Sequence, residues 1–197
     1  MEGLSLSVIG HKFGVSKEAV RQWRIKFEEV FATKPLSNVK ERPVILLDET
    51  KVKRDGKEHM VSPSAVLDLS RREVIAIQAF RSASSFSTIS VMEQALKLCE
   101  SKPITITDHA PWYNWAFEGW YNMEIPWIQV THGLRNYIER WYLTFKNRTK
   151  RFHNNFPIKD PNKALERISK FLHLFAYWYN HMRPHERFHN TTPFSLS

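Results

Sequence analysis

The chain has 197 residues, of which 42% are hydrophobic and 25% charged, a composition typical of a globular protein rather than a disordered or fibrous one. No apolar run reaches the roughly 18 residues of a membrane-spanning helix, and the first residues lack the basic and apolar regions of a signal peptide. The single cysteine, Cys99, excludes an internal disulfide and fits a reducing compartment. These features predict a cytoplasmic protein that does not act at a membrane.

The net charge of +9 is unevenly distributed along the chain. Residues 1–42 carry 8 Lys and Arg against 5 Asp and Glu, and residues 132–197 carry 12 against 4. The middle part, residues 43–131, is slightly acidic, with 9 against 11. Two basic ends around an acidic middle indicate a protein that binds a polyanion such as nucleic acid, with ordinary solubility charge as the alternative.

Residues 1–31 are predicted to form a helix-turn-helix. In "LSVIGHKFGVSKEAVRQW", Gly14 stands at the turn, Gly10 is small where two helices cross, and Ser16 is a good N-cap for the second helix. The expected apolar positions are Ile9, Phe13, Val15, Val20 and Trp23. The spacing resembles that of DNA-binding helix-turn-helix proteins, whose second helix enters the major groove; here it would offer Lys17, Arg21, Gln22 and Lys26. A plain helical hairpin is the alternative, and because almost nothing precedes Leu4 the module is expected to be truncated or reduced.

A linker and then a single larger domain, residues 43–197, are predicted to follow. Residues 32–42 are polar and bounded by prolines, as linkers are. Three strands come next: "VILLDETKVK", closed by an Asp-Gly turn, then "EHMVSPSAVLD", where Pro63 indicates a bulge or an irregular start, and "REVIAIQAF".

The remaining pattern alternates helices and strands. A helix over "SSFSTISVMEQALKLCE" leads to the strand "PITITD", a short aromatic helix leads to the strand "IPWIQV", and two long helices follow, the last opened by Asp160-Pro161 and stopped by Pro184. This order predicts an α/β fold with a mixed five-stranded sheet. An antiparallel meander would be joined by parallel strands, and helices would flank the sheet.

Three acids occupy positions where chemistry is expected. Asp48 ends the apolar part of the first strand, Asp108 ends the fourth strand, and Glu139 lies on the helix after the last strand. The carboxyl ends of parallel neighbours meet at one edge of a sheet, so these acids should converge there. Carboxylates that converge repel one another, and Mg²⁺ or Mn²⁺ would relieve the repulsion. Glu49 must point to the opposite face from Asp48, towards a basic residue such as Lys51 or Lys53, or towards a helix.

The chain resembles the DDE transposases of bacterial and archaeal insertion sequences, which belong to the retroviral-integrase superfamily with its RNase H-like fold. The matching stretches, in family order, are "LLDET", "TDHAPWYN", "RNYIERWYLTFKNRTKRF" and the tail "YNHMRPHERFHNTTP". The third carries the family's Asn–x–x–Glu and a basic residue seven positions on, here Asn136, Glu139 and Lys146. The 30 residues between Asp108 and Glu139 are slightly fewer than usual in the family, but Glu118 and Glu124 are too near Asp108 to replace Glu139.

The resemblance implies a chemistry and a set of partners. Asp48, Asp108 and Glu139 would be the catalytic residues and would hold two Mg²⁺ or Mn²⁺ ions. The reaction would be cleavage of a phosphodiester at the transposon end and transfer of that end into target DNA. The partners would be double-stranded DNA and further copies of the chain, as a dimer or larger assembly, on the nucleoid of a prokaryotic cell.

Basic residues on the helix of Glu139 extend this prediction. Arg135 and Asn136 lie one turn before Glu139, and Lys146 and Lys150 continue the same line after it. Arg148 and Arg151 widen the basic patch. We expect these residues to contact DNA phosphates, although a solvated basic face is the alternative.

Other functions remain to be weighed against a strand-transferase. An inactive or domesticated transposase relic would bind DNA through the helix-turn-helix without cutting it. A host nuclease or resolvase on the same scaffold would cut DNA without strand transfer. The spacing of His181, His185 and His189 suggests a zinc site, but Pro184 interrupts the helix that would align them.

Overall fold

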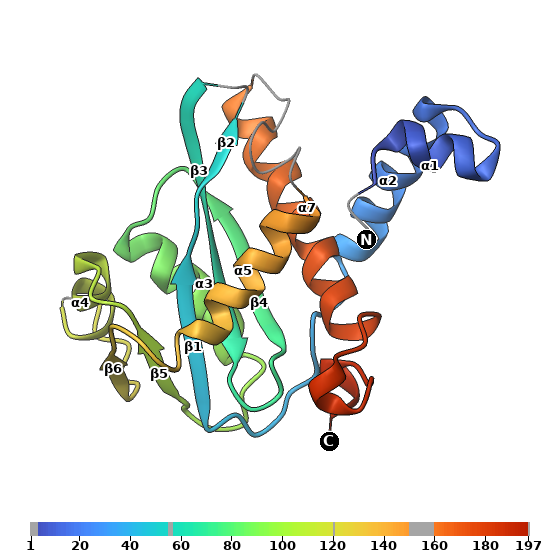
Figure 1. Cartoon of the computed structure of the whole chain (residues 1–197). Helices are drawn as coiled ribbons and strands as arrows, with labels where there is room; N and C mark the ends of the chain where they lie inside the picture. The colour runs from blue at the N-terminus through green and yellow to red at the C-terminus, as the bar shows by residue number, and fades with distance from the viewer. Residues whose placement is uncertain (1–3, 55–56, 120, 150–159, 197) are drawn as a thin grey trace.

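A mixed six-stranded sheet with helices on both faces forms the body of the protein (Figure 1). The computed structural model describes residues 4–54, 57–119, 121–149 and 160–196. The strands are β1 (Val44–Glu49), β2 (Val52–Arg54), β3 (Lys57–Asp68), β4 (Val74–Phe80), β5 (Ile104–Thr107) and β6 (Trp127–Gln129). The helices are α1 (Leu6–Phe13), α2 (Lys17–Ala32), α3 (Ser85–Leu96), α4 (Pro111–Phe117), α5 (Asn136–Arg148) and α7 (Pro161–His181), followed by the 3₁₀ turns η1 (Glu186–Phe188) and η2 (Pro193–Ser195).

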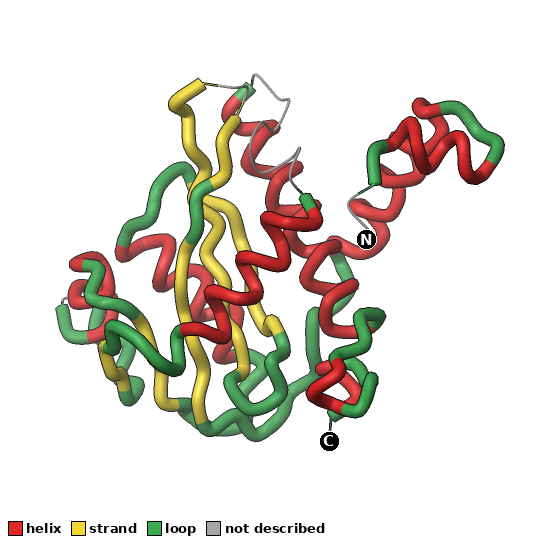
Figure 2. Tube along the Cα trace, viewed as in Figure 1, coloured by secondary structure: helices red, strands yellow, loops and turns green. Residues whose placement is uncertain are grey.

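The strand pairing confirms the predicted combination of a meander with parallel strands. β3 pairs antiparallel with β1, β2 and β4, and β5 pairs parallel with both β1 and β6. The strand order is β2-β3-β1-β5-β6, with β4 on β3. From α3 to α5, helices and strands alternate along the chain, because parallel neighbours need a crossover connection. Figure 2 shows the strands grouped together with helices around them. β1 is therefore a central strand with its carboxyl end beside that of β5.

The prediction of five strands was wrong by one, because the first predicted strand is interrupted. β1 ends at Glu49 and β2 begins at Val52. Glu49 pairs with Ser64 and Val52 with Val61, so the break lies opposite Ser62 and Pro63. Proline has no N–H to donate to a ladder, which accounts for a break opposite Pro63. The register is the same on both sides of the break, and β3 shifts register against β4 between Val66 and Leu67, so the bulge predicted at Pro63 is not found there. The interruption leaves Asp48 near a strand end rather than in the middle of a ladder.

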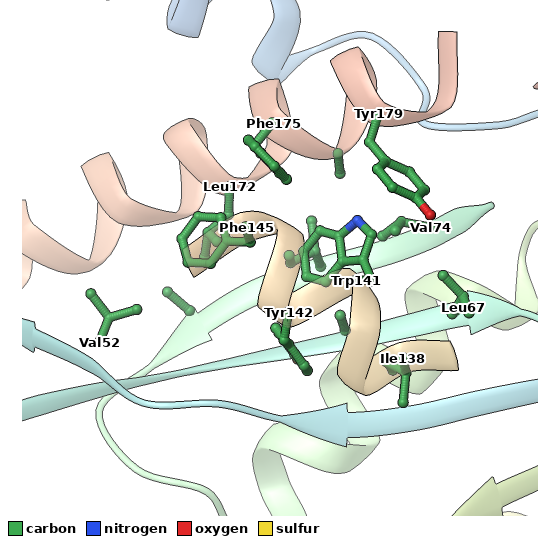
Figure 3. Packing of buried hydrophobic residues seen from close by; sticks show 14 of the residues in the cluster. Val52, Leu67, Val74, Ile138, Trp141, Tyr142, Phe145, Leu172, Phe175 and Tyr179 are labelled. Carbon is green, nitrogen blue, oxygen red and sulfur yellow. The ribbon is translucent and has the colours of Figure 1, made fainter. Parts of the chain in front are cut away.

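The two faces of the sheet are buried under different helices. Leu46 belongs to the cluster that includes Trp141 and Phe145 of α5 and Phe175 of α7 (Figure 3). Its neighbours Ile45 and Leu47 point to the opposite cluster, which residues of α3 and α4 complete. Successive side chains of a strand alternate in this way, so Asp48 shares the α5 face with Leu46.

The segment between α2 and β1, predicted as a linker, is fastened to the sheet by Arg42. The Arg42 guanidinium is fully buried and pairs with the equally buried carboxylates of Asp68 and Glu73. It also donates to Ser37 Oγ at 2.6 Å and to the Leu98 carbonyl at 3.0 Å. We call Arg42, Asp68 and Glu73 the closed cluster. Because every charge in it has a partner, the segment is held rather than loose.

The long helix α7 begins and ends where the sequence predicts. Asp160 caps it by accepting N–H groups of Asn162 and Lys163, and Pro161 occupies its first turn. It ends at His181, ahead of Pro184. Its apolar side lies on the sheet, and no described helix, α7 included, is long and apolar enough to cross a membrane.

The first two helices project from the body as a pair (Figure 1). Gly14 ends α1 with a left-handed φ of 65°, and Ser16 caps α2, both as predicted. A Cβ on Gly10 would meet the Val15 carbonyl oxygen at 2.6 Å, so glycine permits the close approach. Phe13 and Trp23, predicted to be apolar positions of a helix-turn-helix core, are 64% and 43% exposed, and both line an open apolar groove between the pair and α7.

Candidate functional site

Asp48 and Asp108 lie at the ends of two adjacent parallel strands. Leu46 of β1 is in register with Ile106 of β5, and the two aspartates follow each of these residues by two positions. The sequence predicted this meeting on the condition that the strands were neighbours, and that condition holds.

Glu139, in the first turn of α5, completes a three-acid cluster around one cationic nitrogen. Arg135 Nη2 lies 3.3 Å from Asp48 Oδ2, 3.5 Å from Asp108 Oδ2 and 3.5 Å from Glu139 Oε1. All three predicted acids are therefore directed at a single point, which a guanidinium group occupies. The competing acids lie elsewhere: Glu118 caps the end of α4, and Glu124 pairs with Lys102.

The cluster opens towards solvent in a graded way. The Asp48 side chain is 10% exposed, that of Asp108 33% and that of Glu139 49%. A cleft of about 270 Å³ lies beside the acids. Its lining residues are Asp48, Glu49, Thr50, Glu139, Tyr142, Leu143 and Lys146. We call this site the acid cleft; a ligand could reach it from the Glu139 side.

Local hydrogen bonds hold the two aspartates in place. Asp48 Oδ1 accepts the Glu49 N–H at 2.9 Å, and the Asp48 carbonyl accepts the Tyr142 hydroxyl at 2.7 Å. Asp108 Oδ1 accepts the Ala110 N–H at 2.9 Å, in a turn that leads into α4. The remaining oxygen of each aspartate faces Arg135, so both carboxylates are oriented before any ligand binds.

Burial raises the pKa of Asp48 to about 6, because the charged form loses hydration. The positive charge of Arg135 opposes this shift, and the nearby Asp108 carboxylate adds to it. A divalent cation at this point would favour the charged form far more strongly than Arg135 does.

Glu49 lies on the other face of β1, as the alternation of the strand predicted. Its carboxylate accepts the Tyr113 hydroxyl at 2.6 Å and the Trp112 indole N–H at 3.2 Å. Of the partners considered from the sequence, the helix is the one found, here α4. Burial raises the pKa of Glu49 to about 7, and the Asp48 charge contributes to the rise.

The donor set of the cluster fits a hard divalent cation. Three carboxylates from separate elements converge, and Mg²⁺ and Mn²⁺ prefer such oxygen ligands. Within the described parts of the chain, no group of three or more His, Cys, Asp or Glu side chains is arranged as a ready-made metal site. Since Arg135 Nη2 stands where the three carboxylates converge, the guanidinium has to leave before a metal could take its place.

The residues of α5 predicted to contact DNA are distributed over different sides of the helix. Lys146 lines the acid cleft, and Asn136 is exposed at the first position of α5. Arg135 faces the acids, and the Arg148 guanidinium carbon lies 5.1 Å from the Trp178 ring centroid, against α7. Lys150 and Arg151 fall outside the described residues.

The residues of α2 predicted to contact DNA lie on the projecting pair. Lys17, Gln22 and Lys26 are exposed. Arg21 pairs with Glu18 through its Nη2 at 2.7 Å, and Gln22 donates to the same carboxylate. None of the four lines the acid cleft.

Comparison with known proteins places the chain in a family. No protein-family model matches it. The uncharacterized protein MJ0017 of Methanocaldococcus jannaschii is 31% identical over 166 residues, which cover 84% of this chain and 72% of the archaeal protein. The chain belongs to the family of this archaeal protein.

Solved structures establish the fold of this family member. The HTLV-2 integrase catalytic core domain, determined in complex with magnesium, matches with a TM-score of 0.54 at 19% identity, covering 82% of this chain and 96% of that one. The BIV integrase catalytic core domain matches with a TM-score of 0.53 at 12% identity, covering 78% and 92%. The body therefore has the RNase H-like fold of integrase cores, as predicted. At these identities the likeness concerns the fold, and the chemistry is argued from the residues.

Proposed function

We propose that this protein is the transposase of an insertion sequence, a metal-dependent enzyme that cleaves DNA at the ends of the element and joins those ends to target DNA. The observation that carries the proposal is the convergence of Asp48, Asp108 and Glu139 on one cation position at the carboxyl ends of β1 and β5. The integrase-core fold supports it, because a relative of that fold was determined with magnesium.

In this proposal the three carboxylates hold two Mg²⁺ or Mn²⁺ ions. Bound ions would supply the positive charge that activates the attacking oxygen and stabilises the leaving oxygen of a phosphodiester. The chain's own residues prepare the site: β1 and β5 fix the aspartates, and α5 brings Glu139 to the open side. Lys146 lines the same cleft and is placed to bind a phosphate oxygen.

Arg135 has two roles in the proposal. Without metal it neutralises part of the mutual repulsion among the carboxylates. With metal bound at the acids, the guanidinium would be free to contact a DNA phosphate, the contact predicted from the sequence. Arginine suits this second role because its planar N–H groups match phosphate geometry.

The projecting α1–α2 pair would recognise the DNA ends. The turn at Gly14 and the close approach at Gly10 support a helix-turn-helix, with residues 1–31 as a DNA-binding module and residues 43–197 as the catalytic domain. Lys17, Gln22 and Lys26 are exposed on α2, where a groove-reading helix needs its polar side chains. Two DNA ends must be held at once, so the active species would be a dimer or larger assembly on the chromosome of a prokaryotic cell.

A cleavage and joining assay tests the proposal. The purified chain is incubated with Mg²⁺ or Mn²⁺ and labelled duplexes that carry the inverted ends flanking its gene. We expect nicking at the ends and joined products, both reduced at least about 1,000-fold in Asp48→Asn and Glu139→Gln. Glu124→Gln is the matched control, because Glu124 pairs with Lys102 away from the cleft. Binding of the duplex without cleavage under either metal would favour the relic that only binds DNA, and cleavage without joining would favour a nuclease.

A further inference from the structure

A second pocket, rich in arginine and aromatic side chains, lies beside the acid cleft. Its volume is about 320 Å³, at the lower end of the range for small-ligand sites. Residues from the β3–β4 turn, α5, the end of α7 and η1 line it: Arg72, Tyr137, Arg140, Leu143, Thr144, Tyr179, Arg183, His185 and Phe188. We call it the arginine–tyrosine pocket.

The pocket is strongly positive. Three of its lining residues are arginines, one each from the β3–β4 turn, α5 and the segment after α7, and none of the described residues that line it is acidic. Arginines gathered from separate elements around a common space repel one another unless an anion joins them. The charge of the pocket therefore favours an anionic ligand.

Each arginine of the pocket lies near a tyrosine ring. The Arg72 guanidinium carbon lies 3.1 Å from the centroid of the Tyr137 ring, and that of Arg140 lies 5.7 Å from the same ring. The Arg183 guanidinium carbon lies 5.3 Å from the Tyr179 centroid. A guanidinium that stacks on a ring keeps its N–H groups in its own plane, where they can donate to phosphate oxygens.

Two further features mark the pocket as a built site. Arg72 has a φ of 58°, in the left-handed region that costs a residue with a side chain about 1 kcal/mol or more. His185 Nε2 is buried without a hydrogen-bond partner, and its ring lies edge-on to Tyr179 at a centroid distance of 4.7 Å. Burial, aided by Arg183, lowers the pKa of His185 to about 4, so the ring is neutral at pH 7. A neutral ring nitrogen here can bond a ligand atom.

The pocket is a neighbour of the acid cleft on α5. Leu143 lines both cavities, and Arg140 of the pocket follows Glu139 of the cleft in the chain. A polymer bound at the acids would therefore pass close to the pocket.

We propose that the arginine–tyrosine pocket binds one unpaired nucleotide of a DNA strand, next to the phosphodiester held at the acid cleft. The arginine N–H groups would contact its phosphate, and its base would lie against the Phe188 ring, since the Tyr137 and Tyr179 rings already carry guanidinium groups. The inference rests on the proposed function in taking DNA as the polyanion. The flat aromatic faces favour a nucleotide over an acidic peptide, which has no ring to stack.

Binding measured without turnover tests the inference. The probe is a single-stranded oligonucleotide of about ten nucleotides, the length range that such surfaces bind, with a fluorophore and one 5-iodouracil, in EDTA. We expect Arg140→Ala and Arg183→Ala each to weaken binding about tenfold and to lower the slope of log K against log salt by about 0.7. Arg140 is exposed on a helix and alanine is a good helix former, so that variant should fold as the wild type does.

The control is Arg81→Ala, which removes the same charge beyond the far end of β4, where Arg81 contacts Asn162. Irradiation should crosslink the 5-iodouracil to the peptides that contain Tyr137, Tyr179 or Phe188. The inference is overturned if Arg81→Ala weakens binding as much as the pocket variants, if crosslinks map only to other peptides, or if polyglutamate binds with equal affinity.

The two proposals can fail separately. If the pocket variants lose affinity and crosslinks while the wild type cleaves no DNA, the pocket stands and the transposase assignment fails. If the wild type cleaves and joins DNA while the pocket variants bind the oligonucleotide normally, the assignment stands and the pocket inference fails.

Discussion

Two clusters of arginine and acidic side chains lie among the described residues, and they differ in exposure to solvent and in charge balance. In the closed cluster, Arg42, Asp68 and Glu73 are all fully buried, and Arg42 donates to both carboxylates. At the acid cleft, one arginine, Arg135, faces three carboxylates whose exposure rises to 49% at Glu139. The first arrangement is complete without a ligand, whereas the second keeps an excess of negative charge and an open side.

The difference shows how a structural ion cluster can be told from a candidate site. Both contain an arginine among acids, so residue type does not distinguish them. A buried cluster must balance its charges because no solvent can compensate for an unpaired one. A cluster open to solvent can keep unbalanced charge at a moderate cost, and that imbalance is what attracts a cation.

The largest expected effect is the loss of stability when Arg42 is removed from the closed cluster. Arg42→Ala should lower the free energy of unfolding by about 3–5 kcal/mol, because it leaves the Asp68 and Glu73 carboxylates buried without their main cation. Arg135→Ala should cost less than that, since two of its three partners, Asp108 and Glu139, are 33% and 49% exposed and water can compensate for the lost cation. Urea denaturation of both variants checks this, and equal losses would contradict the distinction between the clusters.

The next effect is the pH dependence of stability that the buried carboxyl of Glu49 causes. The pKa of Glu49 rises from 4.5 to about 7 on folding, so the folded state binds more protons between those values. Stability in EDTA should therefore fall as pH rises from about 4.5 to about 7, by up to about 3 kcal/mol. Glu49→Gln should flatten that part of the profile in denaturation at several pH values. An unchanged profile would show that another group, such as Asp48, carries the pH dependence.

A smaller effect, on the affinity for Mn²⁺, tests the excess of negative charge at the acid cleft directly. Arg135→Ala removes the cation that competes for the three carboxylates, so the affinity for Mn²⁺ should rise about tenfold, or about 1.4 kcal/mol. Isothermal titration calorimetry without DNA measures it, with Arg81→Ala as a charge-matched control that should leave the affinity unchanged. A lower affinity in Arg135→Ala would mean that the arginine supports the metal site instead of occupying it.

The smallest effect tests how firmly the cleft is tied to the sheet. The Tyr142 hydroxyl donates to the Asp48 carbonyl at 2.7 Å and lies 3.2 Å from the Pro63 carbonyl. Tyr142→Phe should cost about 1 kcal/mol of stability, because a buried carbonyl loses its donor. Thermal and urea denaturation measure it. No measurable loss would show that the strand pairing alone holds Asp48.

The local pattern of the sequence predicted the parts that depend on neighbours in the chain. The apolar run before Asp48, the Asp-Pro start of α7 and the turn glycine at position 14 act within a few residues, so helices and strands could be placed. The meeting of Asp48 with Asp108 followed from the rule that parallel strands align their carboxyl ends. The predicted number of strands was wrong because the break between β1 and β2 depends on Pro63 of β3, the strand opposite.

The tertiary structure decided which charges meet across the fold. The sequence presents Arg42, Arg72, Arg135 and Arg183 as similar basic residues, yet the first is sealed in the closed cluster and the third faces the acids. The other two line a pocket assembled from the β3–β4 turn and the segment after α7. Electrostatic environment is set by burial and by distance in space, and both arise only when segments far apart in the chain pack together. The sequence by itself therefore determined where the three acids stand on their elements, and packing determined what surrounds them.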